Sequence, residues 1–239
     1  MGIKQELRKA FRRVGYDVCR FTPETYPLAR RKQLLKSYSI DVVFDIGANS
    51  GQYAQQLRDL GYANRIISFE PLSSAFGLLN EKAGSDPNWE IFNIALGDTE
   101  GKQEINIAGN SYSSSLLDML PSHLASAPES KYIGKQTIEI KRLDSIFGGL
   151  CKTTDRVYMK IDTQGYESKV LKGAEKSLMQ IDTIQMEMSL IPLYEDETLL
   201  PEMCMSMRKK GYSLVAIETG FSDLNSGQLL QVDGIFHRF

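Results

Sequence analysis

The chain has 239 residues, of which 42% are hydrophobic and 24% are charged, and its formal net charge is −2. This length allows one sizeable hydrophobic core, and the composition is typical of a globular protein rather than a disordered or fibrous one. No stretch approaches the roughly 20 apolar residues that a membrane-spanning helix needs. The first 20 residues lack the apolar core and the cleavage site of a secretory signal. The three widely spaced cysteines suggest reduced thiols and a cytoplasmic location.

The charge is unevenly distributed along the chain. Residues 1–36 contain ten basic and three acidic side chains, a net charge of +7, which leaves −9 on the remainder. An acidic remainder argues against nucleic-acid binding, because neutralising phosphates requires a basic surface. We expect residues 1–39 to form a basic helical extension, and we favour a solvated helix packed against the rest of the chain. A weak contact of residues 1–36 with an anionic membrane surface, or with an acidic partner, is the second interpretation.

After this extension, apolar runs alternate with helical patterns. Strands are predicted in the first half at 41–46, 65–69 and 90–96, and two shorter ones at 103–108 and 136–141. A first helix begins at Gln52 and ends at Gly61, and a second is expected near 72–83. The second half continues with strands at 156–162, 183–188, 213–218 and 229–239 and with helices at 167–179 and 199–210.

Strands separated by helices predict a mainly parallel sheet covered on both faces, with right-handed crossovers. The last two strands follow each other without a helix, which indicates a final antiparallel hairpin. We therefore expect one α/β domain over 40–239, with an insertion near 103–140. Ligands of such a sheet bind outside the carboxyl ends of its strands.

The segment Asp-Ile-Gly-Ala-Asn-Ser-Gly at 45–51 follows the first of these strands. It matches neither the GxGxxG of dinucleotide-binding proteins nor the Lys-Ser/Thr of a P-loop. The carboxylate of Asp45 would repel a phosphate but attract an ammonium group, and N–H groups at the next helix start can bind a carboxylate. Glu70 ends the second strand, where it can accept both hydroxyls of a ribose. Together these features favour S-adenosylmethionine over a nicotinamide cofactor or a purely structural turn.

Seven motifs resemble, in the same order, the FkbM-type family of S-adenosylmethionine-dependent methyltransferases. They are FDIGANSGQYA, FEP, NIALGD, SYSSSLL, KIDTQGYESKVLKGA, EMSL and VDGIFHR, and they extend from about residue 40 to the C-terminus. The resemblance implies a class I, Rossmann-like three-layer sandwich with a mainly parallel seven-stranded sheet of order 3-2-1-4-5-7-6. It also implies methyl transfer to a hydroxyl of a sugar, glycan or polyketide-like molecule, with S-adenosylhomocysteine as product and a role in polysaccharide biosynthesis. Gln164 departs from the pattern, because many relatives have an acid at this position.

The resemblance also assigns cofactor-binding residues to this chain. The methionine part would be held by Asp45, Gly47, Asn49 and Gly51, and the ribose by Glu70 beside Pro71. The adenine would lie near Ala95, Leu96 and Asp98, although a simple strand exit explains these three residues equally well.

Two acidic residues are candidates for the chemistry. Methyl transfer is an in-line displacement that positioning accelerates, and a hydroxyl acceptor also needs a base or a metal to take its proton. Asp162 and Glu187 end neighbouring strands of the expected sheet, where each could act as base, metal ligand or contact to the ammonium group. Asp162 could equally cap the following helix, whereas a charge at Glu187 in an apolar strand is unfavourable unless paired. No histidine lies near Asp162 in the sequence, so no metal is expected; oxygen ligands would favour Mg²⁺ or Ca²⁺.

The polar segment 109–135 is long for a connection, and such loops are usually functional or disordered. We favour a segment that covers the substrate, in which the side chains suited to a polyol are Tyr112, Ser113, Ser114 and Ser115. Tyr166 and Tyr194 follow the fourth and fifth strands and could line the same pocket, although core packing explains them equally well.

The chain has only two histidines, and neither is expected to be catalytic. His123 is expected on the surface of the 109–135 segment, and His237 is expected to pack within the last strand. The leading interpretation is an O-methyltransferase. A catalytically silent cofactor-binding scaffold that docks a partner through the basic extension is the alternative.

Overall fold

The computed structural model describes residues 3–239 and separates into two compact units, which divide after Ser39. The N-terminal unit contains helices α1 (Ile3–Arg13) and α2 (Pro27–Ser37). Proline is favourable in the first turn of α2, because the N–H group that it lacks would have no partner in the helix there. The second unit, residues 40–239, contains all the strands.

Seven strands form the main sheet, in the order β3-β2-β1-β7-β8-β10-β9. Their bounds are β1 (Val42–Ile46), β2 (Arg65–Phe69), β3 (Trp89–Phe92), β7 (Val157–Ile161), β8 (Ile181–Ser189), β9 (Ser213–Thr219) and β10 (Gln231–His237). β1 pairs in parallel with β2 and β7, whereas β10 is antiparallel to both β8 and β9. Numbered by these seven strands alone, the order is 3-2-1-4-5-7-6. The expected class I methyltransferase fold, with its antiparallel C-terminal strands, is confirmed.

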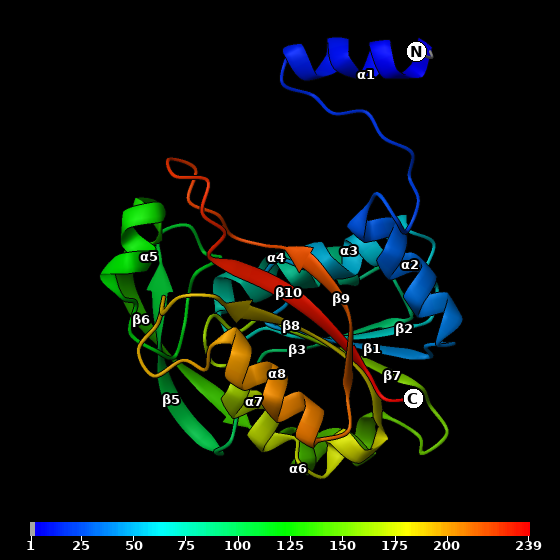
Figure 1. The fold of residues 1–239 in the computed structure, drawn as a ribbon. Coiled ribbons are helices and arrows are strands. Elements are labelled where there is room, and N and C mark those ends of the chain that lie inside the picture. Colours follow the sequence, from blue (N-terminus) through cyan, green and yellow to red (C-terminus); the bar gives the residue numbers. More distant parts are fainter. Residues whose placement is uncertain (1–2) are drawn as a thin grey trace. The chain divides into compact units, whose positions relative to one another are not determined.

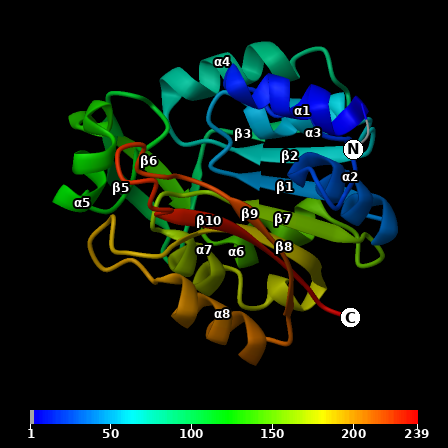
Figure 2. The same ribbon diagram turned by 45° about the horizontal axis from the view of Figure 1, so that its top comes forward.

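Helices cover both faces of this sheet, as Figures 1 and 2 show: α3 and α4 lie on one side and α6, α7 and α8 on the other. Their bounds are α3 (Gln52–Asp59), α4 (Ser73–Ala83), α6 (Leu143–Leu150), α7 (Glu167–Gly173) and α8 (Leu200–Lys209). Every residue of β1 and of β7 is buried, which is why both strands read as nearly continuous apolar runs in the sequence.

The single strand predicted at 90–96 is wrong, because the chain leaves the main sheet within it. β3 ends at Phe92, and the amide of Asn93 then donates to the carbonyl oxygens of Glu70 and Pro71. The next strand, β4 (Ala95–Leu96), belongs to a second sheet of order β4-β6-β5, with β5 (Gly101–Ala108) and β6 (Tyr132–Lys141). The apolar run at 90–96 therefore contributes residues to a strand in each of two sheets.

The helix predicted at 167–179 is shorter than expected. α7 ends at Gly173, and a separate 3-10 helix, η2 (Ser177–Gln180), follows. The backbone of Gly173 lies directly against that of Gly97, so a side chain at position 173 would overlap the carbonyl oxygen of Gly97. This close approach packs the end of α7 against the loop after β4.

The segment between β5 and β6 contains α5 (Pro121–Ser126) and the 3-10 helix η1 (Pro128–Ser130). The expected surface position of His123 is wrong: the side chain is only 3% exposed. Its Nε2 lies 3.2 Å from Ser130 Oγ, and its ring contacts that of Tyr194 at 5.2 Å between centroids. His237 is buried in β10 with Nδ1 2.8 Å from Thr183 Oγ1, which confirms its packing role.

Candidate active site

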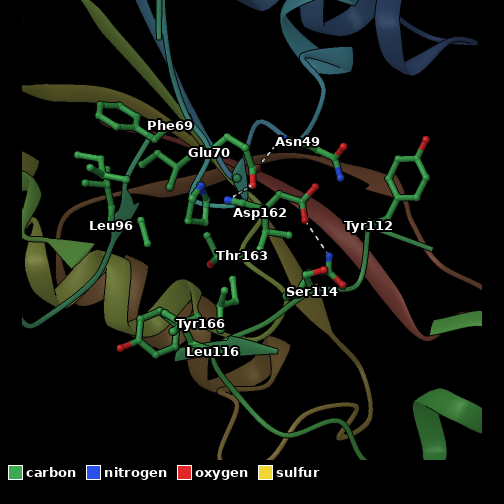
Figure 3. Close-up of a pocket in the computed structure, with 18 of the residues that line it drawn as sticks. Asn49, Phe69, Glu70, Leu96, Tyr112, Ser114, Leu116, Asp162, Thr163 and Tyr166 are labelled. Carbon is green, nitrogen blue, oxygen red and sulfur yellow. Dashed lines mark hydrogen bonds between the residues drawn. The ribbon is translucent and has the colours of Figure 1, made fainter. Parts of the chain in front are cut away.

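A cavity of about 290 Å³ opens at the carboxyl ends of β1, β2 and β7, beside β8. Figure 3 shows the side chains that surround it, among them Asn49, Glu70, Asp162 and Tyr112. Residues from the loops after three neighbouring parallel strands therefore meet at one edge of the sheet, where a doubly wound fold binds its ligands.

The glycine loop after β1 forms one wall of the cavity. Gly47 has a φ of +78°, and a side chain there would overlap the carbonyl oxygen of Asp162. Only glycine therefore lets the loops after β1 and β7 approach each other. Gly51 has a φ of +79° and packs against Leu79 and Trp89, so it fixes the start of α3 and does not line the cavity.

Asp45, which was expected to face the ammonium group of the cofactor, does not line the cavity. Its side chain is fully buried, with Oδ1 3.8 Å from Lys160 Nζ on the neighbouring strand β7. Burial alone would lower the pKa of Lys160, but the carboxylates of Asp162 and Asp45 outweigh it and raise that pKa. The negative charge of Asp45 is thus paired with the positive charge of Lys160.

Glu70 lines the cavity and joins the glycine loop to the end of β2. Its Oε2 accepts the N–H of Asn49 and its Oε1 the N–H of Leu72, both at 2.8 Å. Burial raises the pKa of Glu70 to about 7, against the effect of these two hydrogen bonds. A carboxylate has about four acceptor sites, so two remain for a ligand in the cavity.

Asp162 and Glu187 both line the cavity, and the amide of Gln164 joins them. Gln164 Nε2 donates to Asp162 Oδ1 and to Glu187 Oε2, each at 2.8 Å. Tyr194 donates its hydroxyl to Gln164 Oε1 at 2.7 Å, which fixes the orientation of the amide. Lys160 Nζ lies 3.0 Å from the other oxygen of Asp162. Two carboxyl groups from neighbouring strands are therefore held at fixed positions.

The two carboxyl groups differ in their surroundings. Burial, and then the nearby Asp162, Asp233 and Glu167, raise the pKa of Glu187 well above its ordinary value. A protonated Glu187 can still accept the amide hydrogen of Gln231, whose Nε2 lies 3.0 Å from Oε2. Asp162 is partly exposed and ion-paired with a lysine, which makes it the carboxylate available to a ligand.

The opposite side of the cavity is apolar. Ala95 and Leu96 belong to it as expected, together with Phe69, Leu72, Ile94 and Ile105. Asp98 does not reach the cavity, because its carboxylate is ion-paired with Lys172 Nζ at 3.0 Å. A flat apolar ring can therefore be bound at one end of the cavity and a polar group at the other.

Comparison with known proteins identifies the family. The family model of the methyltransferase FkbM domain, which describes the sequences of that family, matches residues 45–214, more than half of the chain. The chain belongs to the FkbM methyltransferase family. It is therefore an S-adenosylmethionine-dependent methyltransferase.

A curated relative of this FkbM methyltransferase is the 2-O-methyltransferase NoeI of Sinorhizobium fredii (strain NBRC 101917 / NGR234). The two are 27% identical over 164 residues, which span 65% of this chain and 66% of the relative, just under two thirds of its length.

Solved structures of other methyltransferases are also similar. An rRNA methylase from Streptococcus thermophilus has a TM-score of 0.49 and 9% identity, covering 90% of this chain and 98% of its own. The second is the 1,6-didemethyltoxoflavin-N1-methyltransferase of Burkholderia thailandensis, crystallised with S-adenosylhomocysteine. It has a TM-score of 0.47 and 9% identity, and the match covers 88% of this chain and 77% of the other.

The insertion of this FkbM methyltransferase contributes some of its predicted substrate residues to the cavity and not others. Tyr112, which is 63% exposed, and Ser114 line the cavity, and Figure 3 shows both beside it. Ser113 and Ser115 are buried and do not line it. Their hydroxyls hold the insertion in place, since Ser115 Oγ donates to the carbonyl oxygen of Gln164 at 2.7 Å.

The two tyrosines that follow β7 and β8 also differ. Tyr166 lines the cavity, whereas Tyr194 is buried behind Gln164 and acts on the cavity through its hydrogen bond to that amide. Nothing in the sequence pattern pointed to the pairing of Lys160 with Asp45 or to Gln164 as a link between Asp162 and Glu187, because these contacts depend on which strands are neighbours.

Within residues 3–239, no cluster of three or more His, Cys, Asp or Glu side chains has the geometry of a metal site. In the same part of the chain, the helices are all too short or too polar to cross a membrane.

Stability should fall as pH rises from about 5 to 8, and Glu167 should account for part of this fall. Burial raises the pKa of Glu167 to about 7, although Thr163 donates to its Oε1. Between the pKa of Glu167 in the unfolded state and about pH 7, the folded state binds more protons than the unfolded state. The free energy of unfolding that Glu167 contributes at lower pH is therefore lost as pH rises through this range. We expect the fall in unfolding free energy over this pH range to be about 2 kcal/mol smaller in Glu167→Gln than in the wild type.

Urea denaturation at a series of pH values measures this effect. The matched control is Glu195→Gln, which changes an exposed glutamate and should keep the wild-type pH profile. A Glu167→Gln protein whose stability still falls as steeply as that of the wild type would contradict the assignment to Glu167.

Proposed function

We propose that this enzyme transfers the methyl group of S-adenosylmethionine to a hydroxyl of a sugar or glycan. The observation that supports this proposal best is the pair Asp162 and Glu187, held together by Gln164 at the edge of the cavity. The similarity to a 2-O-methyltransferase supports oxygen as the methylated atom.

The residues of the cavity fit the cofactor that the fold implies. Glu70 has acceptor sites left for the ribose hydroxyls, and the apolar wall with Ala95 and Leu96 suits the adenine. The methionine part would lie against Gly47, where the absence of a side chain keeps the loop close, and against Asn49.

Methyl transfer to a hydroxyl needs a group that takes the proton. When bound, S-adenosylmethionine supplies a methyl group on a positively charged sulfur. Asp162 accepts the proton of the acceptor hydroxyl as the hydroxyl oxygen takes the methyl group from the sulfur, and its carboxylate is oriented by Lys160 and Gln164. Glu187, protonated because of its raised pKa, donates a hydrogen bond to a neighbouring acceptor oxygen.

The opening of the cavity suits a polyol. The ring of Tyr112 is largely exposed, so it offers a flat surface for a sugar ring, and Ser114 adds a hydroxyl. Both side chains come from the insertion, so the acceptor would lie against this segment.

The test is transfer of the tritiated methyl group of labelled S-adenosylmethionine to a panel of methyl glycosides, short oligosaccharides and primary amines. The proposal predicts labelled product with at least one of the glycosides or oligosaccharides, and NMR would locate the new methyl group on oxygen. Transfer to amines alone, with every hydroxyl acceptor unlabelled, would contradict it.

Removing the carboxylate of Glu70 should weaken cofactor binding. We expect Glu70→Ala to lower the affinity for S-adenosylhomocysteine about tenfold, because two ribose hydroxyls lose a charged acceptor. Isothermal titration calorimetry measures the change.

Glu70→Gln is the matched variant, because it keeps one acceptor oxygen and the shape of the side chain. It should lose less affinity than Glu70→Ala. Equal and unchanged affinities in both variants, with folding intact by circular dichroism, would show that Glu70 only supports the glycine loop.

A further inference from the structure

The N-terminal unit has a helix with two chemically different faces. α1 (Ile3–Arg13) places its apolar side chains at spacings of three and four residues, so that Leu7, Phe11 and Val14, which directly follows the helix, share one side. Five basic residues and only one acidic residue occupy the rest of the helix. Such a division is the pattern of a helix that lies in a membrane interface.

Within the N-terminal unit, the apolar side of α1 is exposed. Leu7, Phe11 and Val14 are 57%, 40% and 68% exposed, values that are unusual for large apolar side chains so close together in sequence. The segment after the helix continues the pattern, with further exposed side chains at Tyr16, Val18 and Phe21. Contiguous exposed apolar groups mark a surface that binds a partner or a membrane.

The charges next to this surface are basic in excess. Arg8 and Arg12 both pair with the single carboxylate of Asp17, so one positive charge stays uncompensated in that cluster. Lys9 pairs with Glu6, yet its side chain remains half exposed, as do those of the two arginines. Long basic side chains can therefore extend to lipid phosphates while the apolar groups enter the interface.

We propose that α1 and the segment that follows it bind reversibly to an anionic membrane surface. The apolar groups supply burial, and the excess of positive charge selects lipids with negative headgroups. This assignment does not depend on the methyl acceptor. It would bring the methyltransferase to a lipid surface and not across it.

The test is co-sedimentation of the full chain with vesicles of phosphatidylcholine alone or with about one third phosphatidylglycerol. We expect at least about tenfold tighter binding to the anionic vesicles, and a loss of binding as NaCl rises from about 0.1 to 0.5 M. Equal binding to both vesicle types overturns the proposal. Absence of binding to either type also overturns it, and leaves the exposed side chains to a protein partner.

Two pairs of variants separate the apolar contribution from the charge contribution. Leu7→Asp with Phe11→Asp should abolish binding, whereas Leu224→Asp, at a 94% exposed leucine of the other unit, should not change it. Lys9→Gln with Arg13→Gln should weaken binding by about fivefold per charge, so by about 25-fold in total.

Lys152→Gln is the control for the loss of a positive charge elsewhere, because Lys152 is exposed in the second unit. All variants should bind S-adenosylhomocysteine as the wild type does, which verifies folding and keeps this test independent of the proposed catalytic role. Undiminished vesicle binding by the Leu7 and Phe11 variant would overturn the proposal.

Discussion

Asp162→Asn should lower kcat by about 10²–10⁴-fold, because asparagine keeps the shape of the side chain but cannot accept the proton of the acceptor hydroxyl. The amide would still lie at the edge of the cavity beside Gln164 and Lys160. Affinity for S-adenosylhomocysteine should therefore change by no more than about threefold. Single-turnover methyl transfer at saturating cofactor measures the change in rate, and calorimetry measures the affinity for S-adenosylhomocysteine.

Asp98→Asn is the matched control for this prediction. Asp98 is also ion-paired with a lysine, Lys172, but its side chain does not line the cavity, so kcat should stay close to that of the wild type. A rate for Asp162→Asn that remains above about one tenth of the wild-type rate would contradict the role as base. A large loss of cofactor affinity at unchanged kcat would instead make Asp162 a cofactor ligand.

The sequence was sufficient for the main sheet because its central strands are buried on both faces. Runs such as 42–46 and 157–161 contain mostly apolar residues, and the absence of a helix between β9 and β10 showed that the last pair is antiparallel. It was not sufficient for 90–96, where two short strands of different sheets are adjacent in sequence. The turn between them depends on Asn93 and its bonds to residues more than 20 positions away.

The residues that the topology alone places at the cavity were easier to find than the partners of charged groups on the strands. Glu70 and Gly47 follow from the rule that ligands bind at the carboxyl ends of parallel strands, and both line the cavity. Asp45 lies one residue before the end of β1, opposite Lys160 in the register of β1 and β7. Its environment depends on which residue of another strand is its neighbour, which a local pattern does not contain.

Gln164→Glu should place a second carboxylate beside Asp162 and next to the protonated Glu187, in place of the amide that joins them. The resemblance to relatives with an acid at this position suggests tolerance, but the contacts in this chain indicate the opposite. Gln164 Nε2 donates to Asp162 and Glu187 at 2.8 Å, and a glutamate has no hydrogen for either unless it is protonated. We expect a loss of about 3 kcal/mol in unfolding free energy at pH 8, and a more than tenfold lower kcat.

The sign of the pH dependence distinguishes this cause from a simple loss of hydrogen bonds. The folded variant would bind an extra proton in the cluster, so its stability should rise toward that of the wild type as pH falls to about 5. Gln164→Met, which removes the same hydrogen bonds without adding a charge, should lose stability by a similar amount at both pH values. Urea denaturation of the three proteins at pH 5 and 8 measures this. A Gln164→Glu protein with the wild-type pH profile would mean that the amide does not hold Asp162 and Glu187 together, and that their positions depend on Lys160 and Gln231 instead.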